Sequence, residues 1–162
     1  MYKITIAKDY IHFCSAHFII FDATNREMLH GHNYYVSLEL CGHYLADSKL
    51  ADVTSLKLKL KEICDELDHK TLLPAKNEFL TIRQDDQSIH CTYSDQRFVF
   101  PAQDVKIIEY ENTTMEILAH YIADKLENDL NLSTQLSKIE VTVEETSGQS
   151  AAYQKVYNNE KS

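Results

Sequence analysis

The chain has 162 residues, of which 44% are hydrophobic and 25% charged, with only 3 Gly and 2 Pro. This ordinary globular composition is long enough to bury a core, and it predicts a single domain over residues 1–162. The net charge of -9 argues against nucleic-acid binding, which needs clustered Lys and Arg. No apolar run approaches the roughly 18 residues of a membrane span.

The N-terminal stretch MYKITIAKDYIHF alternates between apolar and polar residues and does not resemble a signal peptide. The cysteines are widely spaced and include no CxxC pair, so neither a disulfide framework nor a cysteine-rich zinc site is expected. We therefore predict a cytoplasmic protein with reduced thiols. The four cysteines are Cys14, Cys41, Cys64 and Cys91.

Two alternating segments, residues 2–18 and 30–41, are expected to form the first two strands. Alternation places Ser15 and His17 on one face of the first strand. It places His30, His32 and Tyr34 on one face of the second. We predict that the two strands pair as a hairpin with a long connection through residues 19–29.

A helix is predicted next, with Thr54 as its N-cap and Pro74 as its stop. Residues 75–108 are the least regular part of the chain, and the runs IHCTYS and RFVFP predict an inserted hairpin there. The apolar stripe that indicates the helix consists of Leu56, Leu60, Ile63 and Leu67.

A second helix is predicted from Thr113, where T-x-x-E to Glu116 forms a capping box. The following segment KIEVTVEET predicts a strand, and residues around 104–110 suggest one more. In KIEVTVEET, strand alternation places Glu145 on the face that carries Val141 and Val143. These elements indicate an α+β fold with a mostly antiparallel sheet.

The motif HGH (His30 to His32) places two imidazoles on one strand face. Gly31 between them permits close approach of another backbone or a ligand. If the first two strands pair, His17 joins them, and three histidines can hold a zinc ion with one position open for chemistry. The alternative is that these histidines are polar groups satisfied by backbone carbonyls, and periodicity does not decide between the two.

Several motifs together resemble the 6-pyruvoyl-tetrahydropterin and 6-carboxy-tetrahydropterin synthase family. They occur in the family's order over most of the chain, apart from the insert at about 75–108. The matching motifs are FCSAHF (13–18), LHGHNY (29–34), LDHK (67–70), TTMEILA (113–119) and V-x-V-x-E-T ending at Thr146.

The resemblance implies a tunnelling fold, an antiparallel sheet with two helices on one face in the order β-β-α-α-β-β. In that family the sheets of three subunits close a barrel, and two trimers stack into a homohexamer. The resemblance also implies a Zn²⁺ cofactor held by His17, His30 and His32. The expected partner is a small pterin substrate.

Other site residues are also implied by the resemblance. Glu145 matches the carboxylate that anchors the pterin ring through paired hydrogen bonds. Asp68 and His69 match an acid/base pair, in which the carboxylate orients the imidazole. Additional substrate-binding matches are Thr113, Thr114 and Glu116, although the capping box also explains Glu116.

The sequence departs from the family at the catalytic base. The synthases use a cysteine four residues before the first histidine of HGH, and this chain has Arg26 there. Glu27 is the natural substitute, and its context R-E-x-L-H-G-H-N-Y resembles a variant branch with a glutamate base.

That branch implies a zinc-dependent lyase that cleaves the side chain of 7,8-dihydroneopterin triphosphate. The product would be 6-hydroxymethyl-7,8-dihydropterin, a folate precursor. One alternative is a 6-pyruvoyl- or 6-carboxy-tetrahydropterin synthase of the biopterin or queuosine pathways. A second alternative is a pterin-binding protein that has lost catalysis together with its cysteine.

Overall fold

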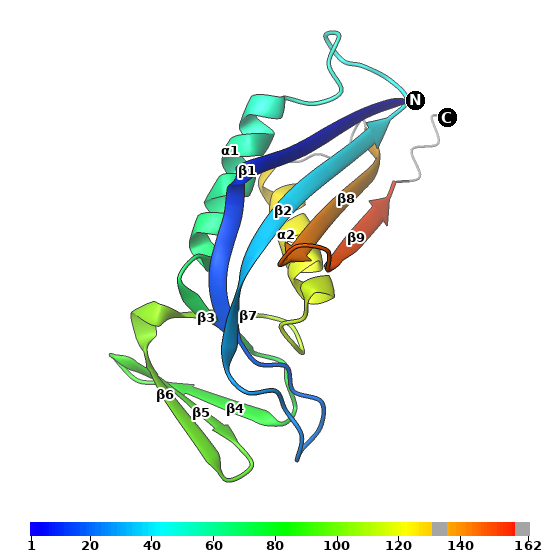
Figure 1. The fold of residues 1–162 in the computed structure, drawn as a ribbon. Coiled ribbons are helices and arrows are strands. Elements are labelled where there is room, and N and C mark those ends of the chain that lie inside the picture. Colours follow the sequence, from blue (N-terminus) through cyan, green and yellow to red (C-terminus); the bar gives the residue numbers. More distant parts are fainter. Residues whose placement is uncertain (131–135, 158–162) are drawn as a thin grey trace.

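The computed structural model describes residues 1–130 and 136–157 (Figure 1). A six-stranded sheet has the strand order β7-β3-β1-β2-β8-β9, and a separate three-stranded sheet has the order β4-β5-β6. Both helices lie on one face of the larger sheet (Figure 1). The elements are β1 (Tyr2–His17), β2 (His30–Gly42), α1 (Val53–Leu67), β3 (Lys70–Pro74), β4 (Leu80–Gln84), β5 (Ser88–Tyr93), β6 (Gln96–Pro101), β7 (Val105–Ile108), α2 (Met115–Leu130), β8 (Leu136–Glu145) and β9 (Ser150–Val156).

Antiparallel pairing of β1 with β2 confirms the predicted hairpin and sets its register. His17 lies opposite His30, and Ser15 lies opposite His32. The register shifts between Ala7 and His12, so the strand changes phase at this bulge. Because of that shift, both the early apolar residues and the later odd-numbered ones, including His17, face the helices.

Close approach of the two strands also depends on Gly31. A side-chain carbon at Gly31 would lie 3.1 Å from the backbone oxygen of Ser15. The absence of a side chain at Gly31 therefore allows the two paired strands to lie this close, as the sequence indicated. This pairing brings the histidine-bearing ends of β1 and β2 together.

Both helix starts differ from the prediction. Asp52, and not Thr54, caps α1, because its Oδ1 accepts hydrogen bonds from the backbone N–H groups of Thr54 (3.0 Å) and Ser55 (3.5 Å). The second helix begins at Met115, and Thr114 Oγ1 accepts from the N–H of Ile117, so the predicted Thr113–Glu116 capping box is wrong. Thr113 is used elsewhere, in contact with His17.

The end of α1 also comes earlier than predicted. It ends at Leu67, well before the predicted stop at Pro74, because the chain turns at Asp68 and continues as β3. The Ser15 hydroxyl donates to the Leu67 carbonyl at 2.6 Å and fastens this end of the helix to β1. Pro74 therefore terminates a strand and not a helix.

Three strands, and not a single hairpin, make up the inserted sheet β4-β5-β6 between residues 80 and 101. Two parallel pairings, β1 with β3 and β3 with β7, make the large sheet mixed at one edge. Its other pairings are antiparallel, and the predicted strand near residues 104–110 is β7. No helix within the described ranges is long and apolar enough to cross a membrane.

The main core lies between the large sheet and the two helices. Leu60 of α1 is 0% exposed within this core, whereas Leu58 on the same helix is 62% exposed. We expect Leu60→Ala to lower the free energy of unfolding by about 2–5 kcal/mol, because it removes buried methyl groups and leaves a cavity. Leu58→Ala is the matched control, with an expected change within about 0.5 kcal/mol. Urea unfolding followed by circular dichroism measures both, and equal losses would contradict this assignment of the core.

Candidate metal and catalytic site

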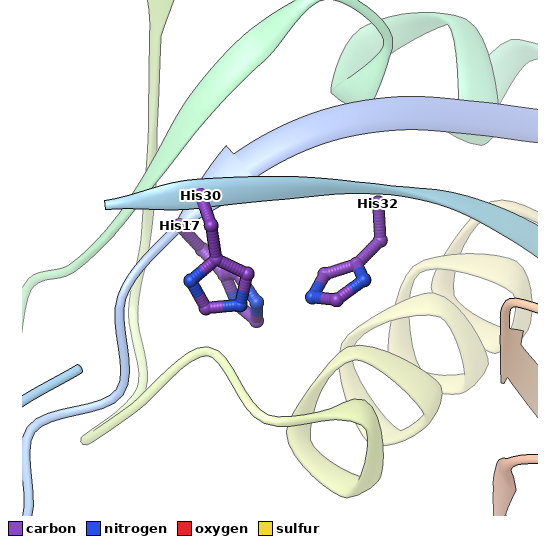
Figure 2. Close-up of side chains that lie close together, drawn as sticks. All are labelled: His17, His30 and His32. Atoms are coloured by element: carbon purple, nitrogen blue, oxygen red, sulfur yellow. The ribbon is translucent and has the colours of Figure 1, made fainter. Parts of the chain in front are cut away.

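Three histidines converge where β1 and β2 meet. His17 comes from the end of β1, and His30 and His32 come from the start of β2. One ring nitrogen from each lies within 4.8 Å of those of the other two. Figure 2 shows the three imidazoles projecting to the same side of the hairpin, above the segment that leads into α2. The strand pairing predicted from the sequence therefore brings together the three predicted metal ligands.

Backbone carbonyls fix the orientation of two of these rings. His17 Nδ1 donates to the Thr113 carbonyl at 2.9 Å, and His30 Nδ1 donates to the Met28 carbonyl at 2.7 Å. With Nδ1 acting as the donor, Nε2 of each neutral ring carries the free lone pair. Metal-binding histidines typically donate their other ring N–H to such a backbone acceptor. The hydrogen bonds to backbone carbonyls, which the sequence analysis gave as the alternative to metal binding, are therefore compatible with it.

Protonation also suits ligation at His17. This side chain is buried, and burial lowers its pKa, an effect that the Thr113 carbonyl opposes and the neighbouring His30 and His32 reinforce. A neutral imidazole is the form that binds a metal ion. Three imidazoles with converging nitrogens fit a first-row divalent ion, and zinc sites with one open position have this donor set.

Glu145 approaches the same histidines from β8. Its Oε1 lies 3.0 Å from His32 Nε2 and 3.8 Å from His17 Nε2, and the side chain is 13% exposed. Tyr34 pairs with Glu145 across β2 and β8, and its hydroxyl lies 3.2 Å from His17 Nε2. Burial, together with the Glu145 charge, raises the Tyr34 pKa, so this hydroxyl stays a neutral donor.

Tyr34 was not predicted as a functional residue. Alternation along β2 places it on the face of His30 and His32, so the signal was present in the sequence. Tyrosine in a strand usually serves packing, and the Tyr34 ring does stack on Phe13 at 4.8 Å. The contact between its hydroxyl and His17 depends on the register of two strands, which the sequence pattern does not specify.

Glu27 lies on the His30 side of the site. Its Oε2 is 3.8 Å from His30 Nε2 and accepts a hydrogen bond from the N–H of Ile19 at 3.2 Å. Both side chains, Glu27 and His30, are 37% exposed. A carboxylate that is partly open and beside the candidate metal site has the placement that a general base requires.

Asp68 and His69 form a pair beside a different part of β1. His69 Nδ1 lies 2.8 Å from Asp68 Oδ2, and Asp68 Oδ1 accepts from the backbone N–H of Cys14 at 2.7 Å. Burial raises the Asp68 pKa, but the hydrogen bonds from Cys14 and His69 outweigh it, so the pKa is lowered. The His69 side chain is 84% exposed. Among the described residues, no hydrogen bond or ion pair joins this pair to the three histidines.

The other predicted substrate contacts have different surroundings. Thr113 is fully buried, and both its carbonyl and its hydroxyl face His17 Nδ1, the latter at 3.3 Å. Thr114 directly precedes α2 and accepts a hydrogen bond from its first turn, in which Glu116 is exposed. Thr113 therefore contacts His17, and its role toward a substrate stays a prediction.

The fold and the site define an α+β protein with a candidate three-histidine metal centre and carboxylates beside it. The chain belongs to the 6-pyruvoyl tetrahydropterin synthase family, whose model matches residues 5–156. This match confirms the resemblance noted in the sequence, the fold class and the expectation of a lyase that acts on pterins.

Relatives agree with this assignment. The chain is 37% identical over 148 residues to a Methanocaldococcus jannaschii protein provisionally named a 6-carboxy-5,6,7,8-tetrahydropterin synthase, with 90% of each chain covered. It is 31% identical to the 6-pyruvoyltetrahydropterin synthase of Plasmodium vivax, with a TM-score of 0.88 over 96% of this chain and 98% of that one. The Plasmodium falciparum enzyme is 29% identical, again with a TM-score of 0.88.

The Plasmodium vivax enzyme also has solved variants of a glutamate described as a catalytic residue. Alanine replaces that glutamate in one variant and cysteine in the other. Both variant structures superpose on this chain with the same TM-score of 0.88. A solved relative at this similarity is therefore described with a catalytic glutamate.

Proposed function

We propose that the protein is a zinc-dependent pterin lyase that cleaves the side chain of 7,8-dihydroneopterin triphosphate to give 6-hydroxymethyl-7,8-dihydropterin. The observation that carries the proposal is the position of the Glu27 carboxylate, 3.8 Å from His30 Nε2. The catalytic glutamate described in the Plasmodium vivax enzyme supports it. Arg26 stands where the synthases have their cysteine, so Glu27 is the nearest base.

His17, His30 and His32 would hold the zinc ion through their ring nitrogens. A zinc ion bound there would supply Lewis-acid stabilisation to the hydroxyl oxygens of the substrate side chain. The Thr113 and Met28 carbonyls keep two of the three rings in the orientation this requires. Burial of His17 limits the access of water to this side of the site.

Glu27 would take the proton from the 2′-hydroxyl of the substrate side chain. The C1′–C2′ bond then breaks, C2′ leaves as the aldehyde of triphosphorylated glycolaldehyde, and the bonding electrons pass to C1′ and the pterin ring. Protonation of C1′ completes the 6-hydroxymethyl group, so the reaction is balanced without an oxidant or reductant. Positioned acid and base groups typically contribute about 10²–10⁴-fold to such proton transfers.

His69 would supply that returning proton, with Asp68 fixing its ring. Because no hydrogen bond or ion pair joins the pair to the three histidines in the described structure, we propose that it serves the site of a neighbouring subunit. This arrangement agrees with the homohexamer that the family resemblance implies. Light scattering coupled to size-exclusion chromatography tests the assembly.

Glu145 would anchor the pterin ring by accepting two hydrogen bonds from its amino and ring N–H groups. Its low exposure and its position beside His32 support this role. Tyr34 would donate to the Glu145 carboxylate and hold it in place. Thr114 and Glu116, at the start of α2, stay predictions as substrate contacts.

A second candidate is a 6-carboxy-tetrahydropterin synthase, and the Methanocaldococcus jannaschii relative favours it because of its name. Both candidates share the fold, the histidines and the pterin anchor. Both products keep only the first side-chain carbon on the ring, and they differ in the oxidation level of that carbon, which is a carboxyl in one and a hydroxymethyl in the other. The reason for proposing the lyase first is that this chain has Arg26 in place of the synthases' cysteine and a glutamate at position 27.

The identity of the product tests the proposal. We expect zinc-loaded protein incubated with 7,8-dihydroneopterin triphosphate to give 6-hydroxymethylpterin, identified by mass spectrometry after oxidation. A 6-carboxy or 6-pyruvoyl product would support the synthase instead. Bound pterin without any product would indicate a binding protein. Protein stripped of metal by a chelator is the control for zinc dependence.

A further inference from the structure

Arg26 lies in an aromatic box between the loop of residues 18–29 and the inserted sheet. Its guanidinium carbon is 4.9 Å from the ring centroid of Phe98, 5.4 Å from that of Phe18 and 5.9 Å from that of Tyr93. Phe18 and Phe98 also stack on each other at 5.1 Å. A guanidinium within about 6 Å of an aromatic centroid is attracted to the ring face.

Hydrogen bonds join the same guanidinium to both sides of this contact. Nε donates to Gln96 Oε1 of the inserted sheet at 2.7 Å, and Nη2 donates to the same oxygen. On the loop side, Nη1 donates to the backbone carbonyl of Glu27 at 2.6 Å. Arg26 therefore connects β6 directly to the peptide unit of the proposed base.

Glu27 itself is fixed by two contacts with Ile19 across the loop. Its N–H donates to the Ile19 carbonyl at 2.8 Å, and its carboxylate accepts from the Ile19 N–H. The loop has a second anchor on the inserted sheet, because the Tyr93 hydroxyl donates to the Asp22 carbonyl at 2.6 Å. The Asn112 side chain, from the segment before α2, also donates to the loop, at the Ile20 carbonyl.

The positive charge of Arg26 is kept away from the Glu27 carboxylate. Arg26 makes no ion pair with the Glu27 carboxylate in the described structure, and its hydrogen bonds go to Gln96 and to the Glu27 carbonyl. The aromatic box therefore places the charge where the guanidinium binds the Glu27 carbonyl and does not pair with the Glu27 carboxylate.

We propose that Arg26 is a positioning residue that holds Glu27 at the histidine site by clamping its loop to the inserted sheet. This inference rests on the proposed role of Glu27 as the base. It also gives the inserted sheet β4-β5-β6 a function, as the platform on which the catalytic loop is fixed. Displacing a catalytic group by about 1 Å can cost around 10²-fold in rate.

The test is the steady-state kinetics of zinc-loaded Arg26→Met with 7,8-dihydroneopterin triphosphate. We expect kcat to fall by about 10–100-fold with KM within about twofold of wild type. Arg26→Lys should resemble Arg26→Met, because an ammonium group lacks the planar fork and the stacking surface. Gln96→Leu, at an exposed position, should lower kcat by a smaller factor with KM again unchanged. It tests the same contact if the Arg26 variants do not fold.

Arg97→Met is the matched control. Arg97 lies on the same strand as Phe98 and is exposed, and its side chain makes no hydrogen bond or ion pair within the described ranges, so its replacement should leave kcat unchanged. A loss of kcat in Arg97→Met equal to that in Arg26→Met would overturn the inference.

A double variant separates positioning from general stability. In the Glu27→Ala background, Arg26→Met should cause no further loss of kcat, because Arg26 acts through Glu27. Full additivity of the two losses would overturn the inference, as would a wild-type kcat in Arg26→Met when Glu27→Ala is slow. Undiminished turnover in Glu27→Ala alone would overturn the proposed base, and the positioning role with it.

Discussion

Replacing Glu27 with glutamine should lower kcat by about 10²–10⁴-fold and leave pterin affinity near that of wild type. Glutamine has the same shape, and its side-chain oxygen can still accept the hydrogen bond that Ile19 donates to Glu27. The loop should therefore keep its structure while the base is lost. Rapid-mixing kinetics and fluorescence titration with a pterin measure the two quantities separately.

Glu78→Gln is the matched control for this prediction. Glu78 is an exposed loop glutamate with no hydrogen bond or ion pair in the described part of the chain. We expect it to leave kcat unchanged. If Glu27→Gln loses less than tenfold, another group removes the first proton and the role of Glu27 is wrong.

Glu27→Cys addresses the identity of the product. A thiolate at this position differs from the carboxylate in basicity and in reach, so the fate of the side chain after the first proton transfer should change. We expect the variant to give more of the synthase-type product than wild type. An unchanged distribution of products would mean that the base does not determine the product.

The histidine site was largely predictable because it depends on short-range regularity. Strand alternation places His30 and His32 on one face whatever the rest of the chain does. Pairing with the adjacent strand then requires only that the connection of residues 19–29 folds back. His17 lies opposite His30 in the structure, which confirms that the two strands pair.

The surroundings of the site were not predictable, because they depend on contacts between distant segments. Thr113 holds His17 across 96 positions of the sequence, and Arg26 reaches Gln96 across 70. The capping box at Thr113 was a plausible local pattern. Thr113 instead contacts the buried His17, and the next residue, Thr114, caps the helix. Local propensity is overridden where a polar group is needed in the core.

The inserted segment shows the same limit in a different form. Its two strand-like runs were recognised, but the third strand, β4, carries the short sequence LTIRQ with a single residue fully buried. A strand with so little apolar alternation is identified by its partner and not by its own pattern. The platform for Arg26 could therefore not be inferred from residues 80–101 alone.

Removing one histidine of the three should abolish stable metal binding and, with it, turnover. His32→Ala is the most informative change, because His32 is partly exposed and its loss leaves no buried backbone carbonyl unpaired. His17→Ala, by contrast, leaves the Thr113 carbonyl without its donor and should also lower stability. Loss of a residue that only orients a ligand typically costs 10–100-fold in metal affinity, so loss of a ligand should cost more than about 100-fold.

His90→Ala is the control, since His90 lies on the inserted sheet and pairs with Asp85, 2.8 Å away. After dialysis, mass spectrometry of the metal content should find about one zinc ion per chain in wild type and in His90→Ala. It should find almost none in His32→Ala. Competition with cobalt and nickel identifies the preferred ion, because three imidazoles accept several first-row metals. Full zinc occupancy in His32→Ala would show that these three histidines are not the metal ligands.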